Sequence, residues 1–201
     1  MGKKGMCLGV CLLFAVSVWT WGLIQDRQYL NRELIRLHVV ANSDSESDQS
    51  IKLQVRDAII TSISADLEKV GDVQSAKDYL QDNLAKIQTV ANKTLEAAGV
   101  DSQAVVTFCK EKFDIRRYDT FSLPTGVYNS LRVVIGDGQG RNWWCVAFPA
   151  LCTSATTDGF EAAAETAGMD DSLSGTLSGD YQLRFYLLDA LGRLENFCLR
   201  D

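Results

Sequence analysis

An acidic cluster early in the chain is the first group of side chains that could do chemistry. The segment Asn42-Ser-Asp-Ser-Glu-Ser-Asp48 carries three carboxylates in seven residues, and carboxylate oxygens are the ligands that hard cations prefer. The segment lacks the turn glycine and the distal glutamate of an EF-hand loop. Ser45 and Asp48 have the spacing of a capping box, in which each side chain accepts the other residue's backbone N–H. We therefore favour a helix start without a metal, which leaves Asn42 and Asp44 as exposed loop groups and candidate binding residues.

The single histidine of the chain, His38, could act as a general base beside Asp44, because imidazole titrates near neutrality. Nothing in the sequence identifies a nucleophile or a substrate pocket to go with it. A histidine with its hydrogen bonds satisfied inside a strand is the interpretation that we favour. We therefore expect no catalytic residue and no cofactor.

A three-glycine turn is followed by two adjacent tryptophans. The stretch Gly136-Asp-Gly-Gln-Gly140 lacks the spacing of phosphate-binding loops and leads into a strand, so it predicts a hairpin turn that uses glycine for positive φ. Neighbours in a strand point to opposite faces of the sheet, so either Trp143 or Trp144 can enter the core. The other must find a ligand, a partner or a covering loop, and it is a candidate contact residue.

Four of the six cysteines lie beyond the N-terminal segment, and four cysteines allow three pairings. Cys145 and Cys152 are the favoured disulfide, because Pro149 can turn the chain between them. Free buried thiols are the alternative. No zinc site is expected, because no C-x-x-C spacing occurs and His38 is remote in sequence.

The N-terminal segment has the order of charged and apolar residues that an export signal needs. Lys3 and Lys4 precede an uncharged run that continues to Ile24. We predict a signal peptide or a signal anchor at residues 1–24, and both remain open, because Thr20-Trp-Gly22 is only a mediocre cleavage site. Residues 25–201 are then expected to form a single exported domain, a length that suffices for a core of its own.

The charge balance argues against nucleic acid as a partner. Lys3 and Lys4 are the only charged residues before Asp26, which leaves 18 of the 20 basic side chains against 26 acidic ones in the exported part. Phosphate contacts need clustered Lys and Arg, which this chain lacks. Contact with a membrane is expected only through residues 1–24.

The order of the elements predicts an α+β fold. Residues 34–41 are nearly continuous in apolar character, which predicts a central strand. A helix should begin at Ser45, and a second should begin at Ser75 and end at Gly99. Other segments are predicted as follows: a polar connector at 25–33, strands at 104–113, 127–135 and 142–148 in an antiparallel meander, a mobile loop at 153–179, a strand near 181–185 and a helix near 188–194. The expected architecture is a mixed, largely antiparallel sheet with helices packed on it.

Two long motifs carry a resemblance to a known family. The first is Ile35-Arg-Leu-His-Val-Val-Ala-Asn-Ser-Asp-Ser45, with Asp48-Gln, Lys52 and Val55-Arg-Asp57 after it. The second comprises Leu123-Pro-Thr-Gly-Val-Tyr128, Leu131-Arg-Val-Val-Ile-Gly136 and Asn142-Trp-Trp-Cys-Val146 through Leu151-Cys152. In this order, and behind an export segment, they resemble the stage II sporulation protein R family.

The resemblance implies a signalling protein and not an enzyme. Members of this family are understood to be made in the forespore and secreted into the space between the forespore and mother-cell membranes. There they activate a membrane-embedded aspartic protease that processes the sigma-E precursor, by contacting its outward-facing part. The expected contact or contact-supporting residues are Asn42, Asp44, Arg56, Asp57, Trp143 and Trp144.

An alternative from another class is a cell-wall-directed glycan-binding protein or hydrolase. A tryptophan would then stack on a sugar, and Asp44 or His38 would serve as acid or base. Hydrolysis would require paired catalytic carboxylates at a defined separation.

Overall fold

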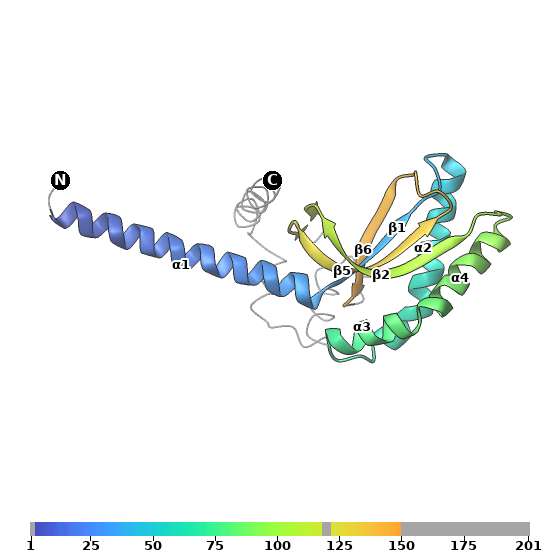
Figure 1. Cartoon of the computed structure of the whole chain (residues 1–201), viewed down its shortest axis with the longest axis horizontal. Coiled ribbons are helices and arrows are strands. Elements are labelled where there is room, and N and C mark those ends of the chain that lie inside the picture. The colour runs from blue at the N-terminus through green and yellow to red at the C-terminus, as the bar shows by residue number, and fades with distance from the viewer. Residues whose placement is uncertain (1–2, 118–121, 150–201) are drawn as a thin grey trace.

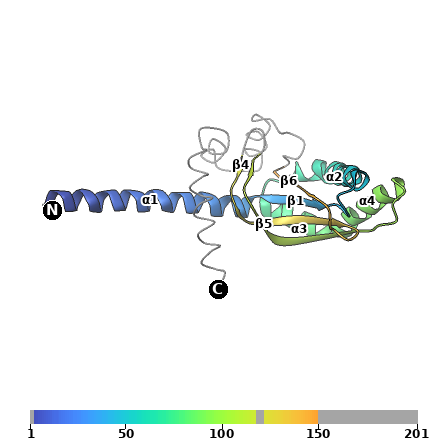
Figure 2. The same ribbon diagram turned by 90° about the horizontal axis from the view of Figure 1, so that it is seen from above.

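The computed structural model describes residues 3–117 and 122–149, which form a mixed sheet with helices packed on one face (Figures 1 and 2). The helices are α1 Lys3–Glu33, α2 Glu46–Leu67, α3 Val73–Asp82 and α4 Leu84–Ala97. The strands are β1 Ile35–Val40, β2 Ala104–Phe113, β3 Arg116–Arg117, β4 Ser122–Leu123, β5 Gly126–Ile135 and β6 Asn142–Phe148. The predicted α+β class with a mixed sheet is confirmed.

The main sheet has the strand order β2-β5-β1-β6. β1 pairs with β5 in parallel and with β6 in antiparallel orientation, while β2 and β5 are antiparallel. Every residue of β1 is buried, so the predicted central strand is confirmed. The predicted meander is wrong at its end, because β5 and β6 are not neighbours and the glycine turn between them is not a hairpin turn. β1 lies between them, and the connection from β5 to β6 crosses the carboxyl end of β1.

The core between sheet and helices is built from alternate residues of the strands. Ile35, Leu37 and Val39 of β1 point into it, as the period of two requires. From α2 come five apolar residues at helical spacing, all of them buried: Ile51, Val55, Ile59, Ile63 and Leu67. The other face of the sheet carries His38 and the alternate residues of β1.

The predicted second helix is two helices. Asp72, and not Ser75, is the N-cap of α3, since its carboxylate accepts the Ser75 backbone N–H at 2.9 Å and the Ser75 hydroxyl at 2.7 Å. The helix then breaks at Asn83, whose side-chain amide donates to the Tyr79 carbonyl at 2.8 Å. The predicted end at Gly99 is confirmed, with φ +73° at that glycine.

The predicted polar connector at residues 25–33 is the last part of α1. Leu30 and Leu34 are buried at the junction with the sheet, so this part of the helix packs on the domain while the earlier part projects away from it (Figure 1). Within the described part of the chain, no helix is both long and apolar enough to cross a membrane. The predicted loop at 153–179 and the strand and helix after residue 180 lie outside the described residues.

We predict that Gly140→Ala lowers the free energy of unfolding by about 1–3 kcal/mol, because it forces an overlap with packed backbone. A Cβ at Gly140 would collide with the carbonyl oxygen of Ser43, where the two loops cross. Urea denaturation should show a lower midpoint with an unchanged slope. The control is Gly71→Ala, where a Cβ meets nothing within 4 Å. Equal midpoints for the two variants would contradict the prediction.

Candidate functional site

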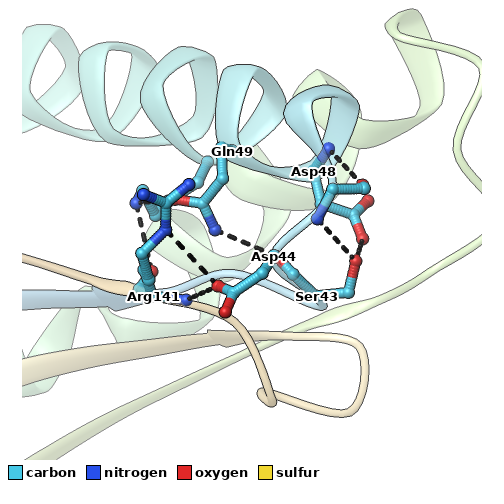
Figure 3. A network of polar contacts seen from close by, with 7 residues as sticks. Ser43, Asp44, Asp48, Gln49 and Arg141 are labelled. Atoms are coloured by element: carbon cyan, nitrogen blue, oxygen red, sulfur yellow. Dashed lines mark hydrogen bonds and ion pairs between the residues drawn. The ribbon is translucent and has the colours of Figure 1, made fainter.

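Two loops cross at the carboxyl end of β1, and side chains of the predicted site hold them together (Figure 3). The Gln139 backbone N–H donates to the Asn42 carbonyl at 3.0 Å, and the Gly140 N–H donates to the Ala41 carbonyl at 2.9 Å. The Asn42 side-chain oxygen accepts the Asp137 N–H at 3.0 Å. Asn42 was predicted to be an exposed loop group, and this is wrong. It is half-buried and bridges the two loops.

Asp48 closes the loop that enters α2. The Ser45 hydroxyl accepts the Asp48 N–H at 3.1 Å, which is one arm of the predicted capping box. The other arm is replaced, since the Ser45 N–H donates to the Ser43 hydroxyl at 3.2 Å. The Asp48 carboxylate instead accepts Ser43 Oγ–H at 2.6 Å and Asn42 Nδ2–H at 3.0 Å. These hydrogen bonds, that from Ser43 first, lower the pKa of Asp48.

Asp44 joins the loop after β1 to the first residue before β6. Its carboxylate accepts the Arg141 backbone N–H at 2.6 Å and lies 3.6 Å from Arg141 Nε. Both side chains are mostly exposed, so Asp44 is exposed as predicted and also supports the crossing (Figure 3). Arg141 lies two residues before Trp143 in the chain, so this pair connects the predicted contact residue Asp44 to the segment that carries Trp143.

Lys52 is a site residue that was not predicted from the sequence. Only 5% of it is exposed, and its ammonium donates to Gln49 Oε1 at 2.6 Å and to the Arg141 carbonyl at 3.1 Å. Burial, followed by the charges of Arg141 and Arg56, lowers the pKa of Lys52. A possible signal was its place one turn before Arg56 on the same side of α2.

Arg56, Asp57 and Trp143 come together where α2 meets β6. The Arg56 guanidinium carbon lies 4.3 Å from the centre of the Trp143 ring, a cation–π contact. Arg56 Nε donates to the Asp57 carboxylate at 2.7 Å. Trp143 is 38% exposed. Three predicted contact residues from two elements therefore form one surface group.

Trp144 lies on the other face of β6, as the alternation of a strand requires. It stacks on His38, with the ring centres 5.5 Å apart, and the Arg116 guanidinium carbon lies 3.7 Å from the ring centre. Trp144 is half-buried. The structure thus separates Trp144 from the group formed by Arg56, Asp57 and Trp143.

His38 is buried between polar groups of two other strands. Its Nδ1 lies 3.0 Å from Glu111 and its Nε2 lies 3.0 Å from the Asn142 side-chain oxygen. The predicted satisfied strand histidine agrees with this, whereas the pairing with Asp44 is wrong because Asp44 lies beyond the end of β1. Glu111 also accepts the Ser130 hydroxyl at 3.1 Å. The hydroxyl therefore bonds to the carboxylate and not to the imidazole, unlike a nucleophile activated by a histidine base.

Two of the four cysteines beyond the N-terminal segment lie among the described residues. Cys145 is disulfide-bonded, and Cys109 is a free thiol. The predicted partner of Cys145 is Cys152, which lies outside the described residues. The pairing of Cys145 with Cys152 therefore stays a prediction.

A family model described as Stage II sporulation protein R matches residues 31–158. The chain belongs to the stage II sporulation protein R family. It is similar to the Stage II sporulation protein R of Bacillus subtilis (strain 168), with 35% identity over 120 residues. That alignment covers 60% of this chain and 54% of the relative, so the chain spans about half the relative's length. No solved structure matches the chain. Membership in the stage II sporulation protein R family supports a role in sporulation, and the crossing loops and both tryptophans lie inside the matched range.

We predict that Asp48→Asn removes about 1 kcal/mol of stability at neutral pH, because a neutral amide oxygen accepts the hydrogen bonds from Ser43 and Asn42 more weakly than the partly exposed carboxylate does. The folded pKa of Asp48 lies below its ordinary value of 3.8. The carboxylate therefore contributes its full stabilisation of the fold at pH values above 3.8. This stabilisation is lost as the pH falls through the folded pKa. Urea denaturation of wild type and variant at several pH values measures the difference, which should shrink in acid. A constant difference would contradict the prediction, and Asp101→Asn at an exposed site is the control.

We predict that Glu111→Gln lowers the free energy of unfolding by about 1–3 kcal/mol, because partly buried groups lose a charged acceptor. The groups affected are His38 Nδ1 and the Ser130 hydroxyl. Thermal or urea denaturation measures the loss. Lys110→Gln, at the exposed neighbouring position on β2, should change the stability by less than about 0.5 kcal/mol. Similar effects of the two substitutions would show that the Glu111 network does not stabilise the fold.

Proposed function

We propose that this chain is an exported sporulation signal that activates a membrane-embedded aspartic protease to process the sigma-E precursor. Membership in the stage II sporulation protein R family supports the pathway. The charged-then-apolar order of residues 1–24 supports export from the forespore into the space between the two sporangial membranes. Within this proposal the segment serves as a signal peptide or as a signal anchor.

Contact with the outward-facing part of the protease is the proposed activity, and no covalent step is assigned to the chain. The observation that carries it is the exposed Trp143 ring, held under the Arg56 guanidinium at 4.3 Å. Tryptophan and arginine are the residues most enriched among those that dominate binding energy. Both are held by regular elements, so little side-chain freedom has to be lost on binding.

Activation follows if the chain binds the active state of the protease better than the inactive one. A ligand shifts an equilibrium only by its difference in affinity for the two states. A tenfold preference supplies about 1.4 kcal/mol, and shifting a population from 1:99 to 99:1 requires a preference of about 10⁴-fold. A signal with this role therefore needs an extended contact, of which the Trp143 group is one part.

The glycan-directed alternative has less support. The Arg56 guanidinium covers one face of the Trp143 ring, which leaves at most one face on which a sugar could stack. His38, proposed as the acid or base of a hydrolase, is only 6% exposed and is hydrogen-bonded on both ring nitrogens. These contacts favour a protein partner over a sugar.

We predict that the full chain, expressed with the membrane protease and a tagged sigma-E precursor, causes cleavage of the precursor on an immunoblot. The same chain without residues 1–24 should give no cleavage, because it remains on the wrong side of the membrane. Precursor intact in the presence of the folded, exported full chain would contradict the proposal. Incubation with purified peptidoglycan is the parallel assay, in which sedimentation with the wall or released fragments would favour the alternative.

A further inference from the structure

The surface where α2 meets the start of β6 carries charges in a symmetric order. The row consists of Asp57, Arg56, Trp143, Arg141 and Asp44. Three contacts join members of the row: the Asp57–Arg56 ion pair at 2.7 Å, the Arg56–Trp143 contact at 4.3 Å and the Arg141–Asp44 ion pair at 3.6 Å. Arg141 lies two residues before Trp143 in the chain. Followed along these contacts and along the chain from Arg141 to Trp143, the row has acidic groups at both ends, basic groups inside them and the exposed ring between the two basic groups.

The row is held in place before any partner arrives. Arg56 is stacked on Trp143 and paired with Asp57, and its side chain is only 17% exposed. The backbone of Arg141 is fixed on both sides, since its N–H donates to Asp44 at 2.6 Å and its carbonyl accepts from Lys52 at 3.1 Å. A surface that is already ordered loses less conformational entropy on binding.

This order of charges disfavours a two-fold dimer whose interface is centred on Trp143. In a two-fold dimer the same patch of each copy faces the other. If the axis runs along the row through Trp143, each charged residue faces itself. If the axis runs across the row, Asp57 faces Asp44 and Arg56 faces Arg141. Either arrangement centred on Trp143 opposes like charges, which costs free energy at an interface.

We infer that the row binds a segment of a different protein that carries an apolar side chain between two acidic residues. The apolar group would pack on Trp143, and the two carboxylates would meet the guanidinium groups of Arg56 and Arg141. Asp57 and Asp44 at the ends favour basic residues outside that acidic pair. This step rests on the proposed function, under which the segment belongs to the outward-facing part of the protease.

Crosslinking from a defined position tests the inference directly. A photoreactive benzophenone amino acid replaces Asp57, which is 61% exposed, in the full chain expressed with the tagged protease. Irradiation should join the chain to the protease. The same group in place of Thr107, exposed on β2 at the opposite edge of the sheet, should not. A crosslink from Asp57 to a second copy of the chain, or crosslinks to the protease from Thr107 alone, would overturn the inference.

Substitutions give an independent readout through precursor cleavage. Trp143→Ala and Arg56→Glu should each reduce precursor cleavage by about tenfold or more. Trp143→Phe, which keeps an aromatic ring, should retain most of the wild-type cleavage. Lys110→Glu, at an exposed site of β2, should leave cleavage within about twofold. Circular dichroism of the purified variants separates unfolding from loss of contact, and the crosslinking experiment keeps Trp143 intact.

The two hypotheses fail in different ways. If the chain with the photoreactive residue at position 57 crosslinks to the protease while the wild-type chain causes no cleavage, the proposed activation is wrong and the contact surface stands. If wild type causes cleavage while Asp57 gives no crosslink and folded Trp143→Ala remains active, the inferred surface is wrong and the activation stands. If neither cleavage nor crosslinking occurs, both are wrong.

Discussion

The complete burial of β1 is the constraint on which the rest of the described structure depends. All six residues of this strand are buried, so both of its edges need hydrogen-bonded neighbours and both of its faces need cover. β5 occupies one edge and β6 the other. Because β5 and β6 follow each other in the chain, the connection between them has to pass over the end of the strand they enclose. The crossing of two loops is a consequence of placing β1 inside the sheet.

The crossing of the two loops explains why a glycine is needed at position 140, why Asn42 bonds to both loops and why Trp143 lies against α2. Backbone approaches backbone at Gly140, where a Cβ would overlap Ser43. Asn42 supplies both an acceptor to the later loop and a donor to Asp48. The same geometry brings the start of β6 against α2, which places Trp143 beneath Arg56. The candidate contact surface is thus an outcome of the topology, and the polar groups below it maintain that topology.

Local sequence patterns were sufficient to predict most of the helices and strands. They were insufficient to predict which elements lie beside one another. The apolar stripe of α2, the Ser45 cap and the central position of β1 follow from periodicity and capping chemistry. The Asp72 cap was missed because Ser75 offers an equally good capping spacing one turn later. The place of β6 could not be predicted, since a glycine-rich turn between two strands usually indicates a hairpin. Glu111 beside His38 and the burial of Lys52 depend on contacts 73 and 89 residues away in sequence, which no local pattern encodes.

The polar groups of the second sheet face belong to the fold more than to function. Arg36 is fully buried, donates to the Cys145 carbonyl at 3.2 Å and lies 4.5 Å from the Phe113 ring centre. His38 is bonded on both ring nitrogens. A side chain that already has its partners inside the protein would have to give them up to bind a ligand, at the cost of leaving buried groups unpaired. Trp143 makes no such demand, because its exposed surface gains from being covered. A partner therefore gains most at the edge where β6 meets α2.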